Sequence, residues 1–212
     1  MKKIFLVTLV FTALFSCKKE TPQPKYSALQ IDSLTAVFEK HIQKVESDFK
    51  TADWSPLTPD DKTEFTHLNY YPYDVSWRFS GPLHINSDPD SFIIRGSREG
   101  DLRPALKYGY FEFEKDNQIN RLQVIKILPT KPDRKPYLFL GFWDETSDQE
   151  TYGGGRYIDI EEKEENFYTL DFNFAYNPYC AYSDRYSCAV PPFENRLKLA
   201  VTAGEKIFKE HE

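Results

Sequence analysis

Apolar residues recur at helical spacing in the segment that follows Tyr26. Every third or fourth position of this segment is apolar: Ile31, Leu34, Phe38, Ile42, Val45 and Phe49. Ser27 and Gln30 have the spacing of a capping box, in which each side chain satisfies a free backbone group at the start of a helix. The pattern predicts one long amphipathic helix from Ser27 to about Lys50, with a single apolar face that packs on the rest of the chain.

Beyond Tyr73 the spacing of apolar residues changes to every second position, which is typical of half-buried antiparallel strands. The segments with this spacing, or with a short apolar run, are 75–80, 92–95, 111–114, 122–128, 137–143, 157–160, 167–172 and 197–201. The segment 137–143 (YLFLGFW) is almost continuously apolar, so we expect it to be a central strand. The alternation slips by one residue at Val124, which predicts a β-bulge there.

One long helix followed by about seven to eight strands predicts a mainly β domain of the α+β class. We expect the strands to form either an antiparallel barrel or a sandwich, with the helix packed against it. The chain shows no internal repeat and no change of composition that would mark a second domain. Residues 26–212 should therefore form a single domain.

The first 16 residues have the pattern of a signal peptide, with Lys2 and Lys3 ahead of an apolar run that is too short to span a membrane. Cys17 directly follows this run, and its position resembles the lipobox of bacterial lipoproteins, in which the cysteine carries the lipid. We expect residues 17–25 to be a lipidated cysteine and a linker, since the linker is charged and proline-bearing. The expected partner is thus a membrane, bound through a lipid anchor.

The charge of the chain argues against one class of partner. The formal net charge is −6 at pH 7, whereas nucleic-acid binding requires clustered lysine and arginine. We therefore expect no nucleic-acid partner. The expected location is the bacterial cell envelope, facing the periplasm or exposed on the surface of the outer membrane.

Cys180 and Cys188 lie in the stretch NPYCAYSDRYSCAVPPFEN. They could form a zinc site, a catalytic thiol or a disulfide. A zinc site usually has closer cysteine pairs and nearby histidines, which the stretch lacks. A catalytic thiol would need a base from a distant histidine. In an exported chain a disulfide is the simplest answer, and so short a loop would stabilise the fold by about 2–3 kcal/mol.

Two other stretches contain residues typical of ligand sites, but their sequence context does not match that of a known site. The glycines of TYGGGRY are followed by a predicted strand rather than a helix, so a phosphate-binding loop is not indicated. The acidic stretch WDETSDQE lacks the spacing and the central glycine of an EF-hand. We expect no metal and no cofactor.

Several stretches together resemble a known family. WSPLTPDDKTEF, the run from FWDET through TYGGGRYIDI, and DFNFAYNPYCAYSDRYSCAVPPFENRL followed by TAGE are similar to the family of unknown function DUF1684. The resemblance covers about Trp54 to Glu205. It implies no activity, because none is established for the family.

The resemblance groups polar residues that lie far apart in the sequence. They flank the glycine turn and the cysteine loop, and they are Tyr152, Arg156, Asp171, Asn173, Asn177, Glu194 and Asn195. If loops from neighbouring strands bring them to one end of the sheet, they line a polar pocket. The competing interpretation is that these side chains cap turns and satisfy buried backbone groups.

The sequence favours a lipoprotein whose domain is a ligand-binding or structural module for an unknown small molecule, glycan or protein. The alternative is a hydrolase that uses carboxylates or Arg156 in the same pocket. A concave pocket with strongly perturbed carboxylates would favour the enzyme. A flat aromatic surface around Tyr70 to Trp77 would favour binding of a glycan or partner.

Overall fold

The computed structural model describes residues 23–208 of the chain, and two helices open it. Helix α1 is Ala28–Thr51, and Ser27 caps it through the predicted capping box with Gln30. Helix α2 is Pro59–Glu64, and the Thr58 side chain accepts a hydrogen bond from the backbone N–H of Asp61 at its start. The long helix is confirmed at its predicted position.

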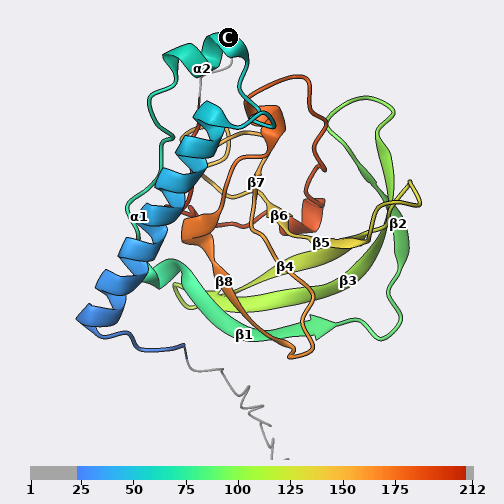
Figure 1. Cartoon of the computed structure of the whole chain (residues 1–212). Helices are drawn as coiled ribbons and strands as arrows, with labels where there is room; N and C mark the ends of the chain where they lie inside the picture. Colours follow the sequence, from blue (N-terminus) through green and yellow to red (C-terminus); the bar gives the residue numbers. More distant parts are fainter. Residues whose placement is uncertain (1–22, 209–212) are drawn as a thin grey trace, which may run out of the picture.

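Six antiparallel strands form the main sheet, in the order β5-β4-β3-β1-β8, with β2 also paired to β3 (Figure 1). Their bounds are β1 Arg78–Ile85, β2 Ser91–Arg95, β3 Leu102–Lys115, β4 Gln118–Ile127, β5 Tyr137–Phe139 and β8 Phe167–Asp171. A separate pair is formed by β6, Gly141–Phe142, and β7, Arg156–Tyr157. The α+β class is confirmed.

The sheet is open, so the expected barrel is wrong for the part of the chain that the structure describes. Closure requires the two outermost strands to pair, and β5 and β8 lie at opposite ends of the strand order. The long strand β3 pairs with β2 over Leu102–Leu106 and with β1 over Gly109–Phe111. The two-stranded β6-β7 pair is too small to be the second layer of a sandwich.

Four predicted strands differ from the observed ones, and of the segment 157–160 only Tyr157 lies in a strand, β7. The segment 137–143 is split into β5 and β6 around Leu140, and β5 is at the edge of the sheet rather than at its centre. Val75–Trp77 is a 3-10 helix, η1, because the Asp74 side chain caps it through the backbone N–H of Ser76. Segment 197–201 forms no strand, although Leu197 N donates to Trp143 O and Glu145 N donates to Leu199 O.

The predicted bulge is present, but its extra residue is on the partner strand. In the register of β3 and β4, Val124 pairs with Gly109 and Ile125 pairs with Lys107, so Tyr108 has no partner. Both Val124 and Ile125 are buried. The slip in the alternation therefore marked the correct place on β4.

Helix α1 packs on loops rather than on the sheet face. Phe38 contacts the rings of Tyr70, Tyr73 and Phe174, and Phe49 contacts those of Tyr179 and Tyr182. Two short 3-10 helices, η2 Phe172–Phe174 and η3 Tyr179–Ala181, lie in these loops, and a further one, η4 Phe193–Asn195, follows later in the chain. The apolar core of the sheet is a separate cluster around Phe111, Leu122, Phe142 and Phe172.

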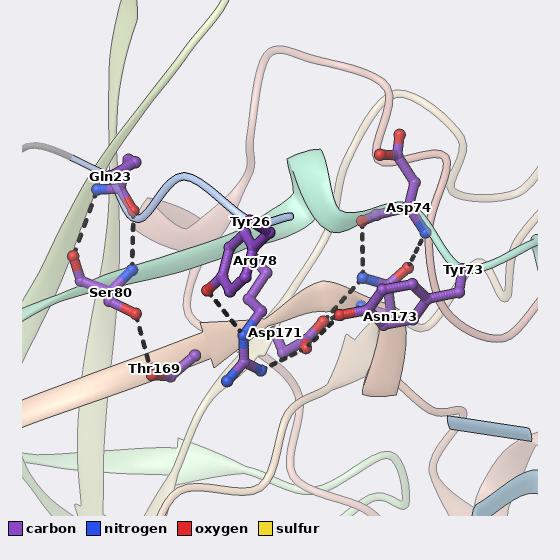
Figure 2. A network of polar contacts seen from close by, with 9 residues as sticks. All are labelled: Gln23, Tyr26, Tyr73, Asp74, Arg78, Ser80, Thr169, Asp171 and Asn173. Carbon is purple, nitrogen blue, oxygen red and sulfur yellow. Dashed lines mark hydrogen bonds and ion pairs between the residues drawn. The ribbon is translucent and has the colours of Figure 1, made fainter. Parts of the chain in front are cut away.

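The segment before α1 is bonded to the sheet, as Figure 2 shows. The Gln23 side chain exchanges two hydrogen bonds with the backbone of Ser80 in β1, at 2.9 and 3.3 Å. The Tyr26 hydroxyl accepts a hydrogen bond from Arg78 Nε at 3.1 Å. The end of the expected linker is thus fixed to β1.

Candidate functional site

A cleft of about 590 Å3 lies between the C-terminal half of α1, the edge strands β5 and β7, and the loop 176–189. His41, Val45 and Asp48 line it from the helix. Leu138 and Phe139 line it from β5, together with residues of the loop. Each wall comes from a distant part of the sequence, so only the fold brings them together.

Aromatic rings form one wall of the cleft. Trp54 and Tyr179 are stacked, with ring centroids 6.3 Å apart and planes inclined by 19°. Tyr186 meets the Tyr179 ring edge to face at 5.2 Å. The Trp54 side chain remains half exposed. Such rings present large apolar faces that are held in place by their neighbours.

A buried carboxylate lies at the inner end of the cleft. Glu205 is 1% exposed, and its two oxygens accept hydrogen bonds from the Tyr182 hydroxyl and from the backbone N–H of Asn177, the latter at 2.9 Å. Burial raises the pKa of Glu205 to about 7, and these hydrogen bonds only partly offset that effect. Burial therefore favours the protonated form of this carboxyl group more than in an exposed glutamate.

A second carboxylate, Asp159, lies at the accessible side of the cleft. Its Oδ1 accepts a hydrogen bond from the Tyr176 hydroxyl at 2.7 Å. Burial and this negative charge raise the pKa of Tyr176, so its hydroxyl stays protonated. The neighbouring Tyr157 donates its hydroxyl hydrogen to the carbonyl oxygen of Ala189.

Arg103 is a cation on the cleft wall, and its guanidinium group is already paired. Its Nε and Nη2 donate to the two carboxylate oxygens of Asp101 at 3.0 and 2.6 Å, and Nη2 also donates to the carbonyl oxygen of Ser187. The hydrogen bond with Asp101 raises the pKa of Arg103 and lowers that of Asp101. The pair fixes the loop at Ser187 to β3.

The expected disulfide is not formed in this structure, because Cys180 and Cys188 are both free thiols. The backbone N–H of Cys180 donates to Cys188 Sγ at 3.2 Å, and the Tyr152 hydroxyl donates to Cys180 Sγ at 3.8 Å. Hydrogen bonding from Cys188 lowers the pKa of Cys180 to about 6, and the same interaction raises the pKa of Cys188. Cys188 lines the cleft.

The predicted polar pocket is not assembled, and of its seven residues Asn177 alone lines the cleft. Arg156 is 1% exposed and lies in the interior, where Nη2 donates to Asp144 Oδ2 at 2.9 Å. It also donates to the carbonyl oxygens of Ala203, Val201 and Glu205. This arrangement ties the C-terminal segment to β7.

Asp171 and Asn173 hold β8 and η2 to the loop before β1 (Figure 2). Asp171 accepts a hydrogen bond from Arg78 Nη1 at 2.7 Å, and the Asn173 amide exchanges hydrogen bonds with the backbone of Asp74. The Asn173 bonds satisfy part-buried backbone groups, as the competing interpretation expected, whereas the Asp171–Arg78 contact is an ion pair.

Asn195 and Glu194 lie in η4, which contacts β4. The Asn195 amide bonds both backbone groups of Gln123 and donates to the carbonyl oxygen of Gly141. Glu194 forms an exposed ion pair with Lys107 at 3.2 Å. Tyr152, in turn, packs with the apolar cluster of Phe49 and contacts Cys180.

The cleft residues that sequence reasoning missed are Trp54, Asp159, Tyr176, Tyr179 and Tyr186. Two of them, Tyr179 and Tyr186, are tyrosines of the cysteine stretch, and Tyr176 directly precedes it, so the unusual tyrosine content of this region was the available signal. Within residues 23–208, no group of three or more metal-ligating side chains is assembled. No helix of the same region is both long and apolar enough to cross a membrane.

Comparison with known proteins identifies a family whose function is unknown. Residues 63–206 match DUF1684, described as a protein of unknown function. The solution NMR structure of an uncharacterized protein of Haloarcula marismortui is similar, with a TM-score of 0.63 and 30% sequence identity. That similarity covers 85% of this chain and 97% of the other. No curated protein matches the chain. On this evidence the chain belongs to the DUF1684 family.

Proposed function

We propose that the protein is a lipid-anchored module of the bacterial cell envelope that binds a small molecule in the cleft beside α1. The observation that carries this proposal is the cleft itself. Its volume of about 590 Å3 falls in the range of roughly 300–1,000 Å3 that is usual for small-molecule sites. Its walls combine fixed rings with a few polar groups, which is the usual composition of such a site.

The anchoring part of the proposal is supported by the sequence. Residues 1–16 and Cys17 lie outside the described part of the chain. Their pattern of charged, apolar and cysteine residues is that of a lipoprotein signal. We place the module on the periplasmic side or on the surface of the outer membrane.

A hydrolase in the same cleft is the alternative, and Glu205 is the observation in its favour. A carboxyl group with a pKa of about 7 suits general acid–base catalysis. However, both oxygens of Glu205 are bonded within the protein and the residue is almost fully buried. Arg156 and Asp171, the other groups considered for catalysis, are bonded within the fold and do not line the cleft. Binding is therefore the better-supported function.

Three probes of one shape and different charge test the proposal: phenethylamine, phenethyl alcohol and phenylacetate. Each is titrated by calorimetry into the full chain, purified in a polyoxyethylene detergent. We expect saturable binding of at least one probe. The Trp54→Ala and Tyr179→Ala variants should each weaken it about tenfold, since ring contacts are worth roughly 1 kcal/mol or more.

Phe193→Ala is the matched control, because Phe193 is 78% exposed and lies outside the cleft. It should leave the affinity unchanged. If none of the probes binds, or if Phe193→Ala weakens binding as much as Trp54→Ala, the cleft is not the binding site and the proposal fails.

A further inference from the structure

The cleft is lined by a hydrogen-bond acceptor that no protein group in the described part of the chain bonds. Asn177 lines it and is 1% exposed, and its Oδ1 has no hydrogen-bond partner among the described residues. The amide orientation is fixed, because Nδ2 donates to the carbonyl oxygen of Lys206 at 2.8 Å. A buried acceptor without a partner costs free energy that a donor on a ligand could recover.

Carboxylates add to this set of acceptors. Asp159 is exposed at the cleft, and the Tyr176 hydroxyl donates to one of its oxygens, Oδ1. Asp48 lines the cleft from α1 and forms an ion pair with Lys44, whose side chain is 73% exposed. An exposed pair of this kind is weak and is readily exchanged.

Four donors on the walls are already bonded to protein acceptors. The hydroxyl groups of Tyr157, Tyr176 and Tyr182 donate to Ala189 O, Asp159 and Glu205. The guanidinium of Arg103 forms a two-point pair with Asp101. An anionic ligand would therefore have to break this pair, and it would also face the carboxylates.

The positive charge available in the cleft is small. Arg103 is neutralised by Asp101, and no lysine lines the described walls. Burial lowers the pKa of His41, so its ring is neutral at pH 7. The cleft thus combines a net negative charge with the faces of Trp54, Tyr179 and Tyr186, and aromatic faces attract cations.

We propose that the ligand of this cleft is a small organic amine that binds as its ammonium ion, with an apolar or aromatic body. The ammonium group donates to Asp159 and to Asn177 Oδ1, and the body lies against the rings of Trp54 and Tyr179. This inference rests on the proposed binding function and names the chemical class of its ligand. A neutral glycan fits less well, because its many hydroxyl groups would need donors as well as acceptors.

The same three probes test the inference through their order of affinity. Phenethylamine should bind at least about tenfold more tightly than phenethyl alcohol, because a charge-assisted hydrogen bond replaces a neutral one. Phenylacetate should bind most weakly. Added salt should weaken binding of the amine and leave binding of the alcohol nearly unchanged.

Asp159→Asn keeps the shape of the side chain and removes its charge. We expect it to reduce the ratio of amine to alcohol affinity about tenfold, whereas Asp133→Asn, at an exposed site outside the cleft, should not change the ratio. Alcohol binding serves as the internal check that each variant is folded.

The possible outcomes separate the two proposals. If the alcohol or phenylacetate binds as tightly as the amine, the amine inference is overturned while the binding function stands. An unchanged ratio in Asp159→Asn would also overturn it. Absence of binding by all the probes contradicts the binding function itself.

Discussion

Replacing Arg156 by methionine should destabilise the fold more than any exposed ion-pair substitution in the described part of the chain. The side chains of Arg156 and Asp144 are each 1% exposed and form an ion pair at 2.9 Å. Removing the guanidinium leaves the Asp144 carboxylate buried without its countercharge. The carbonyl oxygens of Val201, Ala203 and Glu205 lose a donor as well.

The magnitude follows from the cost of an uncompensated buried charge. Breaking a buried pair by removing one partner costs roughly 3–5 kcal/mol. The Asp144 carboxylate keeps hydrogen bonds from Thr146 and from the backbone N–H of Val201, which places the expected loss near the lower value. Since a domain has a stability of about 5–15 kcal/mol, this loss is a large fraction of the total.

Urea unfolding at pH 7 measures the effect. We expect Arg156→Met to lower the midpoint strongly with an unchanged slope, and Arg156→Lys to have an intermediate effect because an ammonium cannot reach all the acceptors. Glu194→Gln is the control, since its exposed pair with Lys107 should be worth at most about 1 kcal/mol. A loss below about 1 kcal/mol for Arg156→Met, at the same slope, would refute the assignment of Arg156 as a structural residue.

Three further predictions concern single groups. Cys188→Ala should raise the pKa of Cys180 from about 6 toward the ordinary thiol value, because it removes the hydrogen bond that lowers this pKa most, and the pH dependence of alkylation measures it. Because the pKa of Glu205 is raised in the folded state, this group stabilises the fold at low pH, and that contribution is lost as the pH rises from about 4.5 to about 7. Glu205→Gln should abolish this part of the pH dependence of the urea midpoint, and an identical dependence in both proteins would contradict the burial argument. Gly109→Ala should destabilise by roughly 1–3 kcal/mol, since its Cβ would lie 2.5 Å from the carbonyl oxygen of His84, and an unchanged melting temperature would show that the bulge adapts.

Local signals in the sequence predicted the elements that local interactions determine. The helix α1 begins where the capping box of Ser27 and Gln30 places it, because both hydrogen bonds are formed within one turn. The alternation at Leu197 and Val201 predicted a strand equally well. Leu197 and Val201 are indeed buried. The segment forms single backbone hydrogen bonds with Trp143 and Glu145, however, and these do not make a continuous strand ladder.

The cleft was not predictable from the sequence for a different reason. Asp48, Arg103 and Asp159 come from a helix, a strand and a loop, and the three are far apart in the chain. No periodicity relates them. Arg156 and Asn195 were predicted to line a pocket because they flank the glycine turn and the cysteine loop. In the structure both side chains form hydrogen bonds with backbone groups inside the fold.

The hydrogen bonds between Gln23 and Ser80 limit how far the domain can move from a membrane. If Cys17 carries the lipid, six Cα–Cα steps separate it from Gln23, and they span at most about 20 Å. The cleft begins near the middle of α1, whose 1.5 Å rise per residue places it about 20–25 Å further along the helix axis. The protein would therefore sample a thin layer of solvent next to the bilayer, and it would capture molecules that pass through that layer rather than those in the bulk of the compartment.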